Sequence, residues 1–196
     1  MSKERLGAYT DAVIAIIITI MVLEMEPPTS SSRQALYEMR HIVLGYILSF
    51  IYLTIYWNNH HHMFQTIKKV TGTTLRANSI LLFVLSLVPF STAWMAENHF
   101  ETNTVVVYGI ILLAAAFAYY NLSNTLKASE GEHSAFAKAI NKDWKGKASL
   151  LLYALGTGLS FIHPNIGLVI FAIVALIRFI PDKRMEKAIE MIEDNI

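Results

Sequence analysis

The sequence predicts an all-α integral membrane protein with six transmembrane helices. Of its 196 residues, 54% are hydrophobic and only 16% are charged, whereas soluble domains carry about 25% charged residues. Six apolar segments follow one another along the chain, separated by short polar connections. The chain has no cysteine, which excludes a disulfide framework and a thiolate metal site. The basic residues occupy short connections, so we expect no nucleic-acid partner.

The first apolar segment runs from about Arg5 to Met25 and is predicted to be a retained helix. Apart from Thr19, every residue in the stretch Ala12–Leu23 is apolar. A cleaved signal peptide is the alternative, because the start is basic and the apolar run has a suitable length. Asp11 at its entry, Pro27-Pro28 beyond its end and the lack of a small-residue cleavage site favour the retained helix.

Helical periodicity divides this segment into two faces. One face carries Arg5, Tyr9, Ala12, Ile16, Thr19, Ile20 and Leu23, and the other carries Asp11, Ile14, Ala15, Ile18 and Val22. At ~100° per residue, Arg5 and Asp11 lie ~600° apart, so each is expected to find its partner on another helix. We expect the first face to line an ion pathway and the second to pack into the protein. From periodicity alone, packing against lipid or another helix is the alternative for Ile16, Thr19 and Leu23.

Five more apolar segments are predicted, at about 39–67, 75–96, 104–126, 148–162 and 166–180. Pro89 is expected to kink the third segment of the chain. The last two segments have 15 residues each, fewer than the ~20 that cross a bilayer. Lys145, Lys147 and Arg178 can lengthen their effective span by snorkelling. A re-entrant hairpin is the alternative for this pair. Beyond them, the chain ends in a short amphipathic tail.

The distribution of basic residues favours a cytoplasmic N-terminus and an even number of crossings, which also places the C-terminus in the cytoplasm. With six crossings, 14 of the 16 basic residues fall on the cytoplasmic side. They are Lys3, Arg5, Lys68, Lys69, Arg76, Lys127, Lys138, Lys142, Lys145, Lys147, Arg178, Lys183, Arg184 and Lys187. The other two basic residues, Arg33 and Arg40, fall on the outer side of the membrane, together with Glu24 and Glu26.

Asp11 is the most informative single residue, because a carboxylate next to hydrocarbon is costly unless it is paired or functional. It is either a structural hydrogen-bond acceptor between helices or an ion ligand or proton carrier. Arg5 lies at the level of the lipid headgroups, where snorkelling is its alternative role. Asn78, deep in the third segment, is expected to make an interhelical hydrogen bond worth roughly 0.6–2 kcal/mol.

Three consecutive histidines, His60, His61 and His62, cannot converge on one metal ion, because neighbours on a helix lie ~100° apart. We expect one of them to face inward, without the sequence saying which. No nucleophile elbow, phosphate-binding glycine loop, metal-ligand pair or cofactor motif occurs. The sequence therefore predicts neither an enzyme nor a protein with a cofactor or a bound metal.

The residues Arg5, Tyr9, Thr10 and Asp11 at the entry of the first segment resemble the signature R-x-x-x-[F/Y]-[S/T]-D of a family of lysosomal potassium channels, transmembrane protein 175. Tyr9 replaces phenylalanine and Thr10 replaces serine, and both keep the chemistry of the position. Similarity continues through Tyr56, Trp57, His60, His61, Phe64, Asn78, Pro89, Phe90 and residues 180–184. The chain length matches one six-helix repeat, as in the bacterial and archaeal branch, which assembles as tetramers.

This resemblance implies a potassium-selective cation channel of the cell membrane, a homotetramer whose central pore is lined by the first helix of each subunit. It implies an aliphatic constriction at Ile16 and a hydroxyl ring at Thr19, and we expect Leu23 to narrow the next level. Residues 1–181 would form the six-helix channel domain and 182–196 a cytoplasmic tail. The permeant ion is K+, and the partners are further copies of the chain, lipid and monovalent cations.

The remaining predicted roles divide into three groups. Ala12 and Ile20 are expected to line the pore secondarily, and Glu24 and Glu26 to attract cations at the outer mouth. An interhelical polar network is expected from Arg5, Thr10, Asp11, His60, His61 and Asn78. Two other functions stay open: a proton-coupled secondary transporter that uses Asp11 and a histidine, and a non-conducting membrane scaffold.

Overall fold

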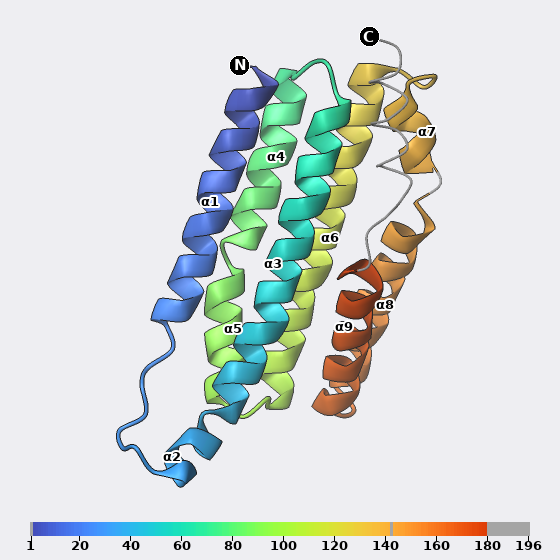
Figure 1. Cartoon of the computed structure of the whole chain (residues 1–196). Coiled ribbons are helices and arrows are strands. Elements are labelled where there is room, and N and C mark those ends of the chain that lie inside the picture. Colours follow the sequence, from blue (N-terminus) through green and yellow to red (C-terminus); the bar gives the residue numbers. More distant parts are fainter. Residues whose placement is uncertain (1, 142, 180–196) are drawn as a thin grey trace.

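The structure, a computed structural model, describes residues 2–141 and 143–179 and contains helices but no strand over those ranges (Figure 1). The helices are α1 (Lys3–Leu23), α2 (Arg33–Glu38), α3 (Arg40–Thr66), α4 (Gly72–Leu85), α5 (Val88–Glu97), α6 (Thr102–Glu130), α7 (Ala135–Asn141), α8 (Trp144–Ser160) and α9 (Pro164–Phe179). The all-α fold class is thus confirmed for these ranges. The predicted amphipathic tail, and with it the domain boundary after residue 181, lies outside the described residues.

Four stretches are long and apolar enough to cross a membrane: α1, α3, α4 together with α5, and α6. Helices α8 and α9 are shorter, with 17 and 16 residues. At 1.5 Å per residue each is ~25 Å long, against a hydrocarbon core of ~30 Å. Length and composition therefore support four of the six predicted crossings, and the last two stay a prediction.

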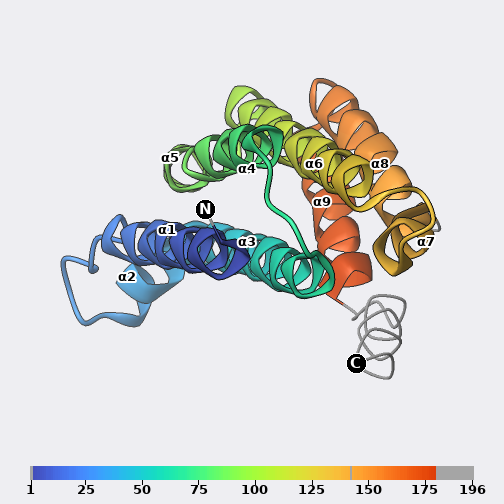
Figure 2. The same cartoon turned by 90° about the horizontal axis from the view of Figure 1, so that it is seen from above.

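The helices run back and forth along one axis (Figure 1). The N-terminus, the α3–α4 connection and the end of α6 lie at one end of the bundle, whereas α2 and the α5–α6 and α8–α9 turns lie at the other. The α3–α4 connection carries Lys68 and Lys69 and the last turn of α6 carries Lys127, so these basic residues share the end that holds the N-terminus. Seen along the axis, α1 and α3 are neighbours in one layer, and α4, α5 and α6 belong to a second (Figure 2).

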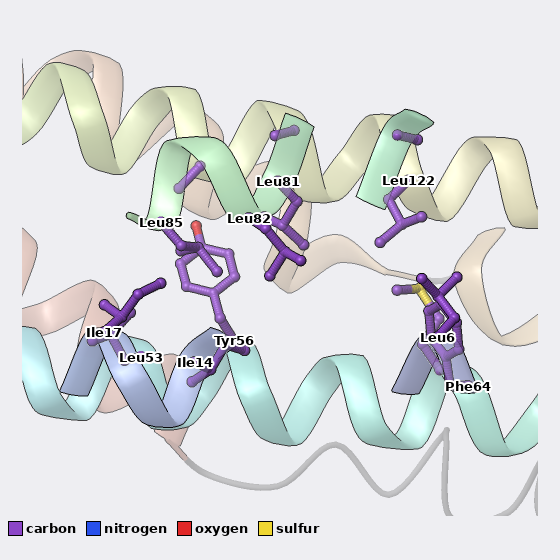
Figure 3. Packing of buried hydrophobic residues seen from close by; sticks show 14 of the residues in the cluster. Leu6, Ile14, Ile17, Leu53, Tyr56, Phe64, Leu81, Leu82, Leu85 and Leu122 are labelled. Carbon is purple, nitrogen blue, oxygen red and sulfur yellow. The ribbon is translucent and has the colours of Figure 1, made fainter. Parts of the chain in front are cut away.

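Large apolar side chains between the two layers form the main core (Figure 3). The labelled members are Leu6, Ile14, Ile17, Leu53, Tyr56, Phe64, Leu81, Leu82, Leu85 and Leu122. Many equally large side chains, such as Phe83, Phe117 and Leu176, are exposed instead. A surface of this kind suits a lipid environment. Because lipid tails are as apolar as leucine, close packing rather than exclusion from water holds the helix faces together.

Two glycines bring α6 and α8 close to α9. A Cβ atom added at Gly109 of α6 would lie 2.6 Å from the Phe171 ring of α9, and one added at Gly156 of α8 would lie 2.7 Å from the same ring. Phe171 itself is fully buried. Small residues that admit a neighbouring side chain are the usual basis of tight helix contacts in membranes. The α8–α9 hairpin is therefore packed firmly onto α6.

The predicted kink at Pro89 is a complete break between α4 and α5. Proline lacks an N–H group, and its ring collides with the carbonyl group four residues earlier, here that of Leu85. Helix α4 accordingly ends at Leu85, a turn follows at Ser86 and Leu87, and α5 begins with Pro89 in its first turn. The break leaves Ser86 exposed beside α1.

Two short helices were not predicted as separate elements. Helix α2 interrupts the polar connection after the first crossing, and its start is capped by the Ser32 hydroxyl, which accepts a hydrogen bond from the Ala35 N–H at 3.2 Å. Helix α7 lies in the connection between α6 and α8, where Phe136 is buried in the main core. This contact fastens the α6–α8 connection to the bundle.

The α3–α4 connection is held by Glu130 at the end of α6, which gives a test of the fold. One carboxylate oxygen of Glu130 accepts the backbone N–H groups of Lys68 at 2.7 Å and Lys69 at 3.0 Å. Glu130→Ala leaves both donors without this partner, so we expect a loss of roughly 1–3 kcal/mol in the free energy of unfolding. Thermal unfolding of the purified protein in detergent measures it.

The matched control is Glu132→Ala, two residues later. Glu132 is highly exposed and reaches Lys127 at 3.7 Å, and exposed ion pairs contribute ~0–1 kcal/mol. An unfolding temperature lowered as much by Glu132→Ala as by Glu130→Ala would contradict the role given to the Glu130 carboxylate.

Candidate functional site

Helix α1 packs on one side only. Its buried residues are Leu6, Thr10, Ile14, Ile17 and Met21, which recur every three or four positions as on a single helical face. On the other side, the residues predicted to line a pore are all exposed in the single chain: Tyr9, Ala12, Ile16, Thr19, Ile20 and Leu23. Ile16 is 58% exposed and Leu23 is 75% exposed. This part of the helix is therefore free to meet lipid, another copy of the chain or an aqueous pathway.

The prediction of which residues of α1 pack into the protein was only partly right. Ile14 is buried and Ile18 is half-buried, but Asp11, Ala15 and Val22 are exposed. The buried stripe is centred on Leu6, Thr10 and Ile17 rather than on Asp11, and a shift of one residue rotates a helical face by ~100°. Asp11 consequently lies at the edge of the packed side.

The Thr19 hydroxyl donates a hydrogen bond to the Ala15 carbonyl at 2.8 Å, one turn back along α1. This bond occupies its single proton and leaves oxygen lone pairs free to accept. Because Thr19 is exposed, that oxygen lies on the uncovered face of the helix. An oxygen in this state can coordinate a cation through its free lone pairs.

A buried polar cluster joins α1, α3 and α4 through Asn78. The amide nitrogen of Asn78 donates to the Thr10 hydroxyl at 2.9 Å, and its amide oxygen lies 2.9 Å from Nε2 of His60. Thr10, His60 and Asn78 are almost completely buried. With an amide oxygen as its partner, Nε2 of His60 carries the proton and donates. The His60 ring also stacks on Phe64, with ring centroids 4.1 Å apart.

A second connection between α1 and α3 lies at the surface. The indole N–H of Trp57 donates to the Asp11 carboxylate at 2.9 Å. The Trp57 ring stacks on His61 with centroids 6.0 Å apart, and His61 in turn is 2.9 Å from the Gln65 amide. The expectation that Asp11 finds its partner on another helix is confirmed. The partner, Trp57, was missed, although an indole N–H in an apolar helix usually finds an acceptor.

Three residues of the predicted polar network lie outside the buried cluster: Asp11, whose surface bond is described above, His61 and Arg5. His61 is exposed because it follows His60 and points ~100° away from it. Arg5 is also exposed, and no hydrogen bond or ion pair of its side chain occurs within residues 2–141 and 143–179. Of the three histidines, His60 is the one that faces fully inward, whereas His62 is half-buried.

The acidic residues predicted at the outer mouth follow the end of α1. The Glu24 N–H donates to the Ile20 carbonyl at 3.0 Å and so closes the helix, and the side chains of Glu24 and Glu26 are exposed. Next to the uncovered face, a groove of about 410 Å³ runs between α1 and the α4–α5 break. It is lined by Val13, Ile16, Ile17, Ile20, Glu24, Ser86, Pro89 and Phe90.

Comparison with known proteins identifies the family. The family model described as endosomal/lysosomal potassium channel TMEM175 matches residues 5–89. A potassium channel of Chryseobacterium sp. (strain P1-3) is 50% identical over 190 residues, covering 97% of this chain and 99% of the relative. A potassium channel of Streptomyces collinus is 27% identical over 184 residues, covering 88% and 89%.

A solved structure agrees with these relatives. The crystal structure of a lysosomal potassium-selective channel TMEM175 homolog from Chamaesiphon minutus superposes with a TM-score of 0.80 at 26% identity, covering 90% of this chain and 95% of that one. The family consists of channels rather than enzymes and is embedded in membranes, which agrees with the apolar helices described above. The chain, a multi-pass membrane protein, belongs to the TMEM175 channel family.

Proposed function

We propose that this protein is a potassium-selective cation channel of the cell membrane, a homotetramer in which K+ passes passively through a central pore lined by α1. The observation that carries the proposal is the uncovered face of α1, which no other helix within residues 2–141 and 143–179 packs against. The relatives of Chryseobacterium and Streptomyces collinus are named potassium channels, and this supports K+ as the permeant ion.

The groove beside α1 favours assembly from several copies. One α1 helix encloses no channel, so a pore lined by this helix needs copies of the chain around an axis. In such an assembly, a neighbouring subunit would fill the groove between α1 and the α4–α5 break and would contact Phe90, which is exposed at its edge. Ile16 and Ile20 line the same groove, so in this assembly they would lie where the neighbouring subunit meets the pore axis.

In the proposed pore, Ile16 forms the constriction. A ring of four isoleucine side chains makes a narrow apolar passage that can gate by dewetting and that a hydrated ion crosses only by shedding part of its water. Thr19, one turn further, would replace some of the lost hydration, because its oxygen is free to accept. Potassium releases its hydration shell more readily than sodium, so this barrier favours potassium. Ala12, Ile20 and Leu23 would line the adjoining levels.

The outer mouth and the membrane orientation complete the proposal. Glu24 and Glu26, repeated around the axis, would raise the local cation concentration in a way that salt screens. The basic connections gathered at the N-terminal end of the bundle support a cytoplasmic location of that end. We infer that α8 and α9 also cross the membrane, which gives six crossings and a cytoplasmic tail at 182–196.

The two other candidate functions gain less support. A proton-coupled carrier that uses Asp11 and a histidine needs the two groups to exchange a proton. However, Asp11 accepts from Trp57, and the buried His60 is bonded to the neutral Asn78 amide. A scaffold would leave reconstituted vesicles impermeable. Fluxes of K+, Na+ and H+ driven by membrane potential in liposomes separate the three: a channel passes K+ in preference to Na+ without a co-substrate.

The constriction is tested by Ile16→Asn. An amide at this position wets the apolar ring, and lowering the barrier by ~1.4 kcal/mol raises the flux about tenfold. We expect K+ flux in liposomes to rise by at least this order, with weaker discrimination against Na+.

Ile110→Asn in α6 is the matched control, because Ile110 is 51% exposed on a helix that has no part in the proposed pore. It should leave the K+ flux unchanged. If Ile16→Asn assembles normally and conducts like the parent protein, Ile16 is not at the constriction.

The role of Asp11 is tested by a pair of substitutions at one hydrogen bond. Asp11→Ala removes the acceptor of the Trp57 N–H, and Trp57→Phe removes the donor. If the bond is structural, each variant should lower the tetramer yield and the thermal stability, by a free energy on the order of 1 kcal/mol, without changing the K+/Na+ ratio. Size-exclusion chromatography and liposome flux provide the two measurements. A stable Asp11→Ala tetramer with altered ion preference would instead place the carboxylate in the conduction path.

A further inference from the structure

A small cavity that plays no part in the proposed pore lies between α3, α6, α8 and α9, with α7 at its edge. Its volume is about 40 Å³, where one water needs ~10–15 Å³, so it accommodates a group of a few heavy atoms rather than a large organic ligand. Five tyrosines contribute to its wall: Tyr52, Tyr56, Tyr119, Tyr120 and Tyr153. The Tyr52 hydroxyl donates to the Phe171 carbonyl and the Tyr119 hydroxyl to the Asn59 carbonyl. The hydroxyls of Tyr56 and Tyr120 make no such bond within the described ranges, so they are the donors that this wall can offer to a ligand.

Arg178 brings a positive charge into this cavity. It is the one charged residue of helix α9, lies in the last turn of that helix and is half-buried. Its guanidinium group lies 5.9 Å from the centre of the Tyr119 ring. Over residues 2–141 and 143–179, the structure records no hydrogen bond and no ion pair of this guanidinium group. A charge that is partly buried is costly unless it is paired, so an anion suits this position at the end of α9.

The charges around Arg178 add to this requirement. Lys147 lines the same cavity, and Lys145, on the same turn of α8, donates from Nζ to the Ile177 carbonyl at 3.5 Å. The Asp143 carboxylate also lines the cavity, but it accepts the Gly146 N–H at 2.9 Å and so caps the start of α8. Among the described residues, the lining therefore contains two cations, Arg178 and Lys147, and one carboxylate, Asp143, which is bonded to the backbone.

We propose that this cavity binds the phosphate group of an anionic ligand, held by the Arg178 guanidinium and by tyrosine hydroxyls. Guanidinium and phosphate form charge-assisted, often bidentate hydrogen bonds. The cavity lies where α8 begins and α9 ends, and basic pockets between transmembrane helices at the cytoplasmic side hold anionic lipid headgroups. The adjacent Phe179 is 58% exposed and offers apolar surface to an acyl chain. The ligand is therefore an anionic phospholipid or a free phosphate ion, and the site is independent of ion conduction.

Native mass spectrometry and thermal unfolding of the full chain can test this site. The protein, purified in a neutral detergent, is titrated with dioleoylphosphatidylglycerol, with dioleoylphosphatidylcholine and, separately, with inorganic phosphate. We expect phosphatidylglycerol to be retained and to raise the unfolding temperature, whereas phosphatidylcholine does neither. Arg178→Gln should weaken phosphatidylglycerol binding about tenfold, the effect of losing one charge-assisted contact. Stabilisation by phosphate alone would identify a soluble anion as the ligand.

Arg76→Gln is the matched control, because Arg76 is an exposed arginine at the start of α4, outside the cavity but at the same end of the bundle. It should bind phosphatidylglycerol like the parent protein. Lys147→Gln, at the cavity wall, provides a second variant should Arg178→Gln fail to assemble, and it should weaken binding in the same direction. The proposal is overturned if neither phosphate source binds, or if the Arg76 variant loses as much lipid as the cavity variants.

Discussion

The side-chain amide of Asn78 is the interaction on which the arrangement of α1 depends. It donates to Thr10 on α1 and lies within hydrogen-bond distance of His60 on α3, so one residue of α4 joins three helices. Polar groups at this depth have little water as an alternative hydrogen-bond partner. Rotating α1 about its axis would break the bond between Thr10 and Asn78. The Thr10 side chain is thereby fixed toward α4. Thr19, nine residues later, then points the opposite way, because nine steps of ~100° equal two and a half turns.

The groove beside α1 has its origin in a different residue. Pro89 ends the regular hydrogen bonding of α4 and divides the third crossing into α4 and α5. Ser86, Pro89 and Phe90 consequently form one wall of the groove, whose other wall is α1. The register set by Asn78 and the break set by Pro89 therefore act together. The first leaves Ile16 uncovered, and the second leaves space next to it for a neighbouring subunit in the proposed tetramer.

The sequence predicted which segments are helices better than it predicted how those helices are rotated. Runs of apolar residues located the four long crossings within a few positions, because segment length and composition are local properties. Periodicity gave the angle between Ile16 and Thr10, but not which of them meets the core. It therefore placed Asp11 on the packed face, although Thr10 occupies that face. Likewise, His60 rather than His61 faces inward because Asn78 lies at the level of His60 along the bundle and bonds to it. The sequence does not show this tertiary contact. Helix α2 was not predicted because none of its residues is buried, so its sequence carries no apolar pattern.

An uncovered apolar face on a single chain fits a lipid-facing surface as well as a pore, and the composition of α1 favours the pore. Other exposed surfaces of the protein carry large rings, including Phe83, Phe117 and Phe161. Between Tyr9 and Leu23, the exposed side of α1 has no aromatic residue and includes Ala12, Ala15 and Thr19. Small side chains let helices approach closely around an axis, and a hydroxyl whose proton is already bonded offers only its oxygen. Lipid tails have no group that interacts favourably with such an oxygen, whereas a partly dehydrated cation can be coordinated by it.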